Sequence, residues 1–331
     1  STPLYSSAAS DVYKRQGIGE ALIDFIPNVK NSELKDVEQF SRQVGGAPAN
    51  VVSVARKMGA STEMVTQLGN DAFGDIIVET LKNIGVGTQF IKRTDEANTA
   101  LAFVSLKEDG QRDFSFYRKP SADMLYKAEY LNEITINPND VLHFCSVDLV
   151  ESNMKEAHKA MVNKFKSANA IIVFDPNVRL PLWQNAEACK EAIHEFLPKA
   201  NVIKISDEEL EFITGEADED KAIQSLFEGS VEAVIYTQGA AGASIILKDG
   251  TKIYHEGFKV KAIDTTGAGD AFIGAAISRM LLSDELNITK LLKEEGQDIL
   301  KFSNMVAAKV TTKYGAIESI PTIEDVTTEL N

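Results

Sequence analysis

Short apolar runs alternate along this chain with longer segments of helical periodicity, and this alternation limits the possible folds most strongly. The strand-like runs are 17–26 (GIGEALIDFI), 63–68 (EMVTQL), 140–145 (DVLHFC), 170–175 (AIIVFD), 201–206 (NVIKIS) and 233–238 (AVIYTQ). The helix-like segments between them include 48–59, 151–167 and 186–199. Nearly continuous apolar strands are typical of a parallel sheet that helices cover on both faces. The sequence therefore predicts an α/β fold with three layers.

One region departs from this rhythm. Residues 98–118 contain two runs of alternating polarity joined around Asp109-Gly110, which is a strong signal for a β-hairpin. A hairpin does not fit a strand–helix alternation, so we expect it outside the main sheet. With the loop before it, from about residue 89, and part of the N-terminal region, it is expected to form a small β lid. Such a lid would exclude water from a reaction site.

The charge balance restricts the partners. There are 34 Lys and Arg residues against 49 Asp and Glu, which leaves a formal charge of −15. So acidic a surface repels nucleic acid and anionic lipid, and no apolar stretch reaches the 18 residues of a membrane span. An anionic ligand would need a locally positive site, built from backbone amides, helix N-termini and a few cations. The two cysteines, Cys145 and Cys189, lie in apolar or helical patterns and form no disulfide framework, which suits a reducing cytoplasm.

The first sixteen residues are expected to be foreign to the protein. Residues 6–16 read SSAASDVYKRQ, and the DNA that would encode them resembles a common transposon-type sequencing adapter. A secretory signal needs a charged start and an apolar run, and neither is present there. We expect the native sequence to begin near Gly17, without the first residues of its opening strand. Residues 17–331 then form one domain with its lid.

The segment 260–282 (VKAIDTTGAGDAFIGAAISRMLL) carries the chemistry. A strand passes through a Gly-Ala-Gly turn, Gly267, Ala268 and Gly269, into an apolar helix. Glycines let backbone N–H groups converge on a ligand, and the helix adds the positive end of its dipole. This pattern predicts an anion hole for a phosphate in transfer. Asp270 stands in the first helical turn, where a carboxylate can accept the proton of a hydroxyl in line with that phosphate. On its own, an aspartate there also serves as a cap.

The longer string DTTGAGDAF (264–272) resembles the C-terminal signature of the ribokinase-like (pfkB) carbohydrate kinases, and QVGGAPANVVSVARKMGA (43–60) resembles their N-terminal signature. The resemblance extends over essentially everything after residue 16. It implies a three-layer ribokinase-like fold with a small β lid, and ATP-dependent phosphorylation of a small sugar. By the same resemblance, the sugar is bound by Asp24, Gly45, Gly46 and Asn50. From residue type alone, the two glycines are a plain turn and Asp24 is a solvated strand end.

The resemblance also implies a nucleotide end. Glu209 matches a glutamate that organises Mg²⁺ through water, and Ser206 stands where the family motif has asparagine. The candidate ATP-binding residues are Ser206, Glu209, Thr237, Gly239, Gly242 and Asn304. Asp264 and Thr266 resemble ligands of a monovalent cation such as K⁺, with further ligands expected from carbonyl groups in 310–315.

Two strings, FYRKPSADML (116–125) and FDPNVRLPLW (174–183), resemble bacterial fructokinases in particular. They make Arg118 and Arg179 candidates to touch the substrate or the travelling phosphate, the alternative being exposed arginines on solvated faces. The implied reaction is the conversion of D-fructose to fructose 6-phosphate, with Asp270 as the base. A 2-keto-3-deoxygluconate kinase, a ribokinase, and a non-catalytic sugar-binding or regulatory protein stay as alternatives. A Rossmann dehydrogenase does not fit, because 17–24 lacks a G-x-G-x-x-G turn. The exposed edges of the lid predict a homodimer formed through it.

Overall fold

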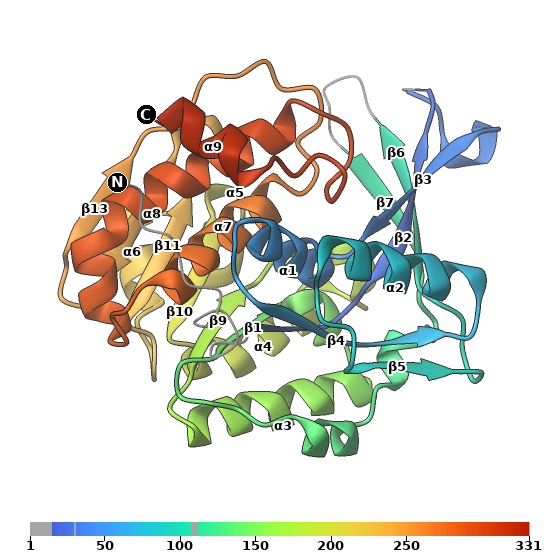
Figure 1. Cartoon of the computed structure of the whole chain (residues 1–331), viewed down its shortest axis with the longest axis horizontal. Helices are drawn as coiled ribbons and strands as arrows, with labels where there is room; N and C mark the ends of the chain where they lie inside the picture. Colours follow the sequence, from blue (N-terminus) through green and yellow to red (C-terminus); the bar gives the residue numbers. More distant parts are fainter. Residues whose placement is uncertain (1–14, 30, 107–111, 331) are drawn as a thin grey trace.

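A sheet of nine strands runs through the body of the protein in the computed structural model, which describes residues 15–29, 31–106 and 112–330 (Figure 1). In spatial order its strands are β13 (Lys252–His255), β12 (Ala243–Leu247), β11 (Ala233–Thr237), β10 (Val202–Ser206), β9 (Ile171–Asp175), β8 (Val141–Cys145), β1 (Arg15–Ile18), β4 (Thr62–Gly69) and β5 (Ile91–Thr94). The pairs are parallel except β11–β12 and β12–β13, which are antiparallel. The predicted, mainly parallel sheet is thus confirmed.

Helices cover both faces of this sheet. They are α1 (Ala47–Lys57), α2 (Ala72–Ile84), α3 (Asn153–Ser167), α4 (Ala186–Phe196), α5 (Asp207–Thr214), α6 (Glu219–Ser225), α7 (Ala268–Leu282), α8 (Ile288–Thr311) and α9 (Ile323–Leu330). Short 3₁₀ turns are η1 (Leu34–Asp36), η2 (Asp123–Leu125), η3 (Ala128–Glu133), η4 (Ser146–Asp148), η5 (Leu180–Leu182), η6 (Leu197–Lys199) and η7 (Gly239–Ala241). Among the described residues, no helix has the length and apolar character needed to cross a membrane.

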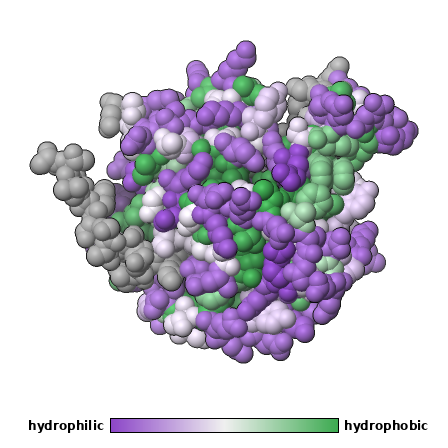
Figure 2. Space-filling model, turned by 45° about the vertical axis from the view of Figure 1, so that its right-hand side comes forward, coloured by the Kyte–Doolittle hydropathy of each residue, from purple (hydrophilic) through white to green (hydrophobic). Residues whose placement is uncertain are grey.

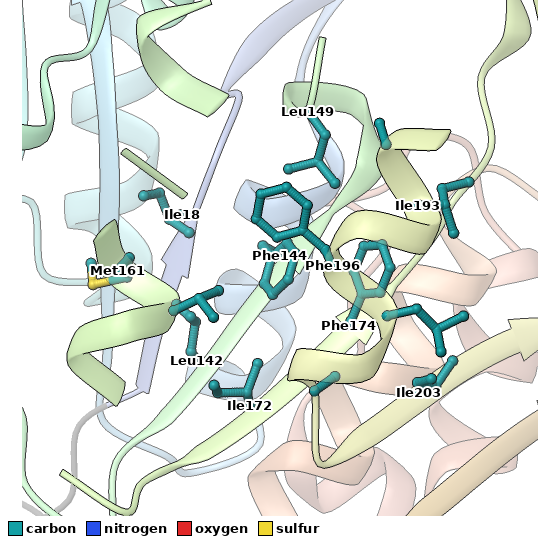
Figure 3. Close-up of a cluster of buried hydrophobic side chains, with 14 of the residues drawn as sticks. Ile18, Leu142, Phe144, Leu149, Met161, Ile172, Phe174, Ile193, Phe196 and Ile203 are labelled. Carbon is teal, nitrogen blue, oxygen red and sulfur yellow. The ribbon is translucent and has the colours of Figure 1, made fainter. Parts of the chain in front are cut away.

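Successive strand residues enter different cores, as the two-residue period of a strand requires. Leu142 and Phe144 of β8 pack with α3 and α4, where Phe144 stacks on Phe174 at 4.7 Å between ring centroids (Figure 3). Val141, the residue before Leu142, packs instead in the cluster that contains α7 and α8. Both faces of the sheet are therefore buried, and the expected three layers are present. The outer surface is mostly hydrophilic, with hydrophobic residues gathered near the middle of the face seen in Figure 2.

A second sheet of four strands stands beside the main body, at the right of Figure 1. Its order is β3 (Phe40–Gly45), β2 (Leu22–Pro27), β6 (Leu101–Leu106) and β7 (Arg112–Tyr117). The antiparallel pair β6–β7 corresponds to the predicted hairpin, while the turn at Asp109-Gly110 lies outside the described residues. The small sheet includes less of the chain than the predicted lid segment of 89–118, because residues 91–94 form β5, which pairs with β4 of the main sheet.

The opening strand differs from its prediction. Residues 17–26 were expected as one strand, yet β1 ends at Ile18 in the main sheet and β2 begins at Leu22 in the small sheet. The chain turns at Gly19, which has φ of +140°, and a Cβ there would lie 2.4 Å from an oxygen of Asp148. β1 starts at Arg15, inside the segment expected to be foreign, since strand pairing needs only backbone groups. Residues 1–14 lie outside the described residues.

Candidate active site

The candidate site lies where the strand order reverses, around β1, which has β8 on one side and β4 on the other. In open α/β sheets, ligands bind at the carboxyl ends of the strands beside such a switch point. Asp175 ends β9 and Ser206 ends β10 at this edge, and the N-terminus of α7 and the small sheet lie next to it.

The loop before α7 has the shape expected of an anion hole. Gly267 is the residue before the first helical residue and has φ of +72°, so the turn favours glycine. A Cβ at Gly267 would lie 2.8 Å from the Cβ of Ala316, which makes the position too tight for a side chain. Ala268 and Gly269 follow in the first turn, where backbone N–H groups carry the positive end of the helix dipole. The loop therefore offers a compact positive surface.

Asp270 is buried beside this loop, with 8% of its surface exposed. Its Oδ2 accepts a hydrogen bond from Asn50 Nδ2 at 2.8 Å, and its Oδ1 accepts one from Asn177 Nδ2 at 3.4 Å. Burial raises the pKa of Asp270, and the Asn50 hydrogen bond with the charges of Arg179 and Lys204 lowers it only in part. The result is a carboxylate of increased basicity that two amides hold in place. Asn177 was not predicted, although it stands in the string that made Arg179 a candidate.

Lys204 is a second residue near the site that was not predicted from the sequence. It lies in β10, and its Nζ is 3.2 Å from both carboxylate oxygens of Asp175. A Cβ added to Gly269 would be 3.4 Å from this Nζ, so the ammonium group faces the anion-hole loop. Burial alone would lower the pKa of Lys204, but the negative charges of Asp175 and Glu209 outweigh this effect. The pKa is raised above its ordinary value, so the lysine stays protonated. A lysine inside an apolar strand is unusual enough to have been a signal.

The predicted sugar-binding residues meet at the start of α1. The side chain of Asp24 in β2 points at Gly45, where a Cβ would lie 2.1 Å from Asp24 Oδ2. Gly46 has φ of +100°, and a Cβ on it would lie 2.6 Å from the carbonyl oxygen of Glu20. Asn50 follows one turn later, and its N–H donates to the carbonyl oxygen of Gly46 at 2.9 Å. Asp24 therefore lies beside Gly45, and Asn50 links the turn at Gly46 to Asp270.

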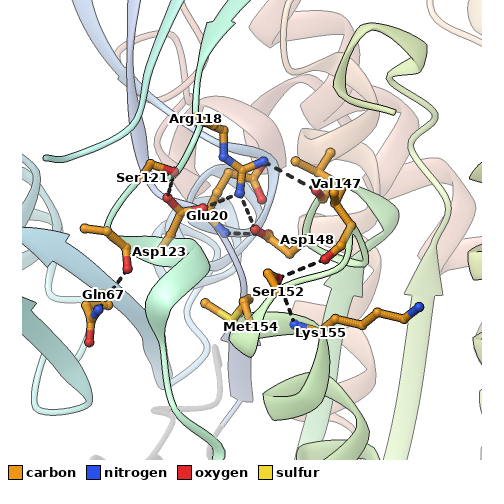
Figure 4. Close-up of polar contacts among 12 residues, drawn as sticks. Glu20, Gln67, Arg118, Ser121, Asp123, Val147, Asp148, Ser152, Met154 and Lys155 are labelled. Atoms are coloured by element: carbon orange, nitrogen blue, oxygen red, sulfur yellow. Dashed lines mark hydrogen bonds and ion pairs between the residues drawn. The ribbon is translucent and has the colours of Figure 1, made fainter. Parts of the chain in front are cut away.

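The two candidate arginines lie in different surroundings. Arg179 follows β9, lowers the pKa of Asp270 by its charge, and lies 5.9 Å from the ring centre of Phe114 in the small sheet. It therefore joins the strand ends to the lid beside the site. Arg118 is buried, and its guanidinium forms ion pairs with Asp123 and Asp148 (Figure 4). The alternative of an arginine on a solvated face is therefore wrong, and a contact between Arg118 and the substrate stays a prediction.

At the nucleotide end, the Glu209 carboxylate is already hydrogen-bonded on both oxygens. The Oε2 of Glu209 accepts hydrogen bonds from the backbone N–H of Ser206 at 3.1 Å and from the Ser206 hydroxyl at 2.7 Å. These bonds form a capping box at the start of α5. The Oε1 of Glu209 accepts from the N–H of Val178 at 2.7 Å. Burial raises the pKa of Glu209, but the charge of Lys204 and these hydrogen bonds lower it below its usual value. Glu209 is therefore ionised, and a role toward Mg²⁺ stays a prediction.

The remaining nucleotide candidates gather around η7. Thr237 ends β11, and Gly239 and Gly242, at the start of η7 and just after it, have φ of +53° and +105°. A Cβ on Gly239 would meet no atom within 4 Å, so this turn borders open space. Asn304 of α8 donates from Nδ2 to the carbonyl oxygen of His255 at 3.1 Å, close to Gly242. These residues therefore share one side of the site with the N-terminus of α5.

Asp264 ties the anion-hole loop to the segment after α8. Its Oδ1 accepts from the N–H and the hydroxyl of Thr266 at 2.8 and 2.7 Å, and its Oδ2 accepts from the N–H of Gly315 at 3.1 Å. Within the described ranges, no group of three or more His, Cys, Asp or Glu side chains is arranged to hold a metal ion. A monovalent-cation site at Asp264 and Thr266 stays a prediction.

Comparison with known proteins places this geometry in a family. Residues 17–323 match the model of the pfkB family carbohydrate kinases. Fructokinase-2 of rice, Oryza sativa subsp. japonica, is 39% identical over 319 residues, covering 96% of this chain and 94% of that protein. The structure of a fructokinase from Xylella fastidiosa with bound ATP superposes with a TM-score of 0.83 at 31% identity, covering 95% of this chain and 97% of that one.

A fructokinase from Vibrio cholerae O395, solved with fructose, ADP and calcium, gives a TM-score of 0.86 at 28% identity over 96% of this chain and 99% of its own. The predicted ribokinase-like fold and family resemblance are thereby confirmed. The chain belongs to the pfkB family of carbohydrate kinases.

Proposed function

We propose that this chain transfers the γ-phosphate of ATP to the 6-hydroxyl of D-fructose. The observation that carries the proposal is the position of Asp270, a buried carboxylate held by Asn50 beside the first turn of α7. The names of the relatives support fructose as the sugar, since plant proteins about as similar as the rice enzyme are also named fructokinases. Solved relatives contain ATP in one case and fructose with ADP in another.

Asp270 takes the proton of the sugar hydroxyl as the oxygen attacks the γ-phosphorus of ATP, while the bond from that phosphorus to the bridging oxygen breaks and ADP leaves. Its two amide partners fix the carboxylate, and its raised pKa makes it a better proton acceptor than an exposed aspartate. The sugar is held by Asp24, Asn50 and the backbone at Gly45 and Gly46, which places one hydroxyl next to the base. Most of the rate gain then comes from alignment.

Charge on the travelling phosphate is stabilised by groups that this chain supplies. The first-turn amides of α7, from Gly267 to Gly269, face it together with the ammonium of Lys204 and the guanidinium of Arg179. These groups form a positive surface in an otherwise acidic protein, which fits a polyphosphate. Glu209, ionised at the start of α5, would hold Mg²⁺ through water, and that ion would neutralise the phosphate chain.

Other sugars are less well supported. A 2-keto-3-deoxygluconate kinase would need a cation for the carboxylate of its substrate, and the ion pairs of Arg118 leave Arg179 as the candidate that faces Asp270. Ribose stays an alternative within the same mechanism. A sugar-binding protein without activity would not need a buried base beside an anion hole, so the presence of both favours the kinase.

The test is ATP-dependent phosphorylation of fructose, 2-keto-3-deoxygluconate, ribose and glucose, with Asp270→Ala and, as a matched control, the exposed Asp284→Ala. We expect fructose to give the highest kcat/KM and Asp270→Ala to lose about 10²- to 10⁴-fold in kcat while it still binds the sugar. Asp284→Ala should equal the wild type. Another leading sugar would overturn the fructose assignment, and no turnover by folded protein would favour the binding protein.

A further inference from the structure

A buried glutamate occupies the point where the chain leaves the main sheet for the lid. Glu20 lies between β1 and β2 and has 2% of its surface exposed. Its Oε1 accepts a hydrogen bond from the N–H of Ala47, the first residue of α1, at 2.9 Å. Its Oε2 is buried and accepts no hydrogen bond from a donor among the described residues. Buried carboxyl groups are costly, so one placed here needs a reason.

Glu20 also belongs to a cluster that receives the far end of the lid. The N–H of Glu20 donates to Asp148 Oδ2 at 2.7 Å, and Arg118 Nη2 pairs with Asp148 Oδ1 at 2.5 Å (Figure 4). Arg118 directly follows β7, the last strand of the lid, and its guanidinium also pairs with Asp123. One carboxylate, Asp148, therefore anchors both the entry into β2 and the exit from β7.

The side chain of Glu20 extends this anchor to the sugar end of the site. A Cβ on Gly46 would lie 2.6 Å from the carbonyl oxygen of Glu20, and the N–H of Ala47 donates to the Glu20 carboxyl, so both groups of this residue border the turn before α1. Asn50 lies in the next turn and holds Asp270 at 2.8 Å. A continuous series of hydrogen bonds and close contacts thus runs from the cluster through Glu20 and α1 to Asp270.

We propose that Glu20 is a positioning residue, whose carboxyl holds the Gly45–Ala47 turn and Asn50 in register with Asp270 for sugar binding. The inference rests on the proposed sugar-kinase function. The N–H of Ala47 is among the helix-start N–H groups that lack a partner inside the helix, and Glu20 supplies its acceptor. Without the Glu20 side chain, the turn that contains Gly45 and Gly46 would lose the hydrogen bond that holds it at Ala47.

The protonation state suits this role. Burial, followed by the negative charge of Asp148, raises the pKa of Glu20 well above its ordinary value. Burial also raises the pKa of Asp148, but the charge of Arg118 lowers it below the usual value. A protonated Glu20 keeps one oxygen as acceptor for Ala47 and gives the other a proton to donate toward Asp148. Glutamine has the same shape and the same two functions.

The experiment compares Glu20→Ala, Glu20→Gln and Ala47→Pro. Proline is well tolerated at the first position of a helix; it removes the N–H that Glu20 binds and puts its ring carbon where that hydrogen lay. We expect Glu20→Ala and Ala47→Pro to raise the KM for fructose about three- to tenfold, the value of one hydrogen bond, with the KM for ATP changed less than about twofold. Glu20→Gln should restore the wild-type KM, and the double variant Glu20→Ala/Ala47→Pro should be no worse than either single variant.

A merely structural role would lower the melting temperature without this split between the two KM values, and would overturn the inference. So would a fructose KM within about twofold of wild type in both Glu20→Ala and Ala47→Pro. Hydrogen exchange of the peptide 44–52 without ligand gives a second readout, in which Glu20→Ala should lose protection and Glu20→Gln should keep it. If the wild type phosphorylates no sugar, the proposed function fails, and this exchange still decides whether Glu20 holds the turn.

Discussion

Removing the amide of Asn50 should make Asp270 a stronger base that works only at higher pH. Asn50 Nδ2 lies 2.8 Å from Asp270 Oδ2, which makes it the shorter of the two amide contacts of the carboxylate. The hydrogen bond stabilises the ionised form and is among the influences that lower the pKa of Asp270 against the effect of burial. Its loss in Asn50→Ala therefore raises that pKa.

The size of the shift follows from the type of bond. A hydrogen bond to a charged acceptor contributes about 1.5–3 kcal/mol, and one pKa unit corresponds to about 1.4 kcal/mol. We therefore expect the pKa of Asp270 to rise by about 1 to 2 units in Asn50→Ala. Asn177 Nδ2 is 3.4 Å from Asp270 Oδ1, a long and weak contact, so its loss should shift the pKa by well under one unit. Asn177 has φ of +45°, so Asn177→Gly is the control that keeps the backbone unstrained.

The assay is the pH dependence of kcat/KM for the sugar between pH 5 and 9. The base must be deprotonated, so activity falls as pH drops through the pKa, and a higher pKa moves this acid limb toward higher pH. Asn50 is also a candidate sugar ligand, so the plateau will fall as well, and the midpoint of the limb is the quantity to compare. An unchanged midpoint in Asn50→Ala, or a larger shift in Asn177→Gly, would refute the assignment of Asp270 as the base that Asn50 tunes.

Two further outcomes are expected. Lys204→Met should lower kcat and cost about 3–5 kcal/mol of the free energy of unfolding, because it leaves the buried Asp175 without its partner. The double variant Lys204→Met/Asp175→Asn should regain most of that stability in urea unfolding but not the kcat, and recovery of both would contradict a role of the ammonium toward phosphate. Asp71→Ala should cost about 0.5–2 kcal/mol at pH 7, because Asp71 caps α2 at the N–H of Gly74 and also binds Thr99. Partial burial raises the pKa of Asp71, but these hydrogen bonds lower it overall, so its contribution is present above the unfolded pKa of about 4 and is lost as pH falls through the folded value. Urea unfolding at pH 7 and pH 3 should therefore show the difference between variant and wild type shrink in acid.

The elements and their order could be predicted because their signals are local. The helix expected at 48–59 is α1 at Ala47–Lys57, and the predicted strand 170–175 is β9 at Ile171–Asp175. The turn before α7 could also be predicted, because a backbone with positive φ, as at Gly267, strongly favours glycine. Asp24, Gly45, Gly46 and Asn50 were found by resemblance to a family, and the fold brings them together.

The errors arose where a distant residue decides the local structure. The break between β1 and β2 depends on Asp148, which is 128 residues from Glu20, so 17–26 read as one apolar strand. The ion pairs of Arg118 could not be predicted, because nothing in the sequence around it marks Asp123 and Asp148 as its partners. Lys204 could have been found, since a charge in an apolar strand requires a buried partner.

The helix that carries Asp270 has almost no free surface. Most of α7, from Asp270 to Leu281, is buried, and it lies packed between α1 and α8. A substitution on this helix therefore disturbs the core before it can adjust the chemistry, so few changes there survive selection for a stable fold. Exposed positions on the lid strands, such as Tyr117, can change at less cost to the core. The architecture separates a part that must stay constant from a part that is free to diversify.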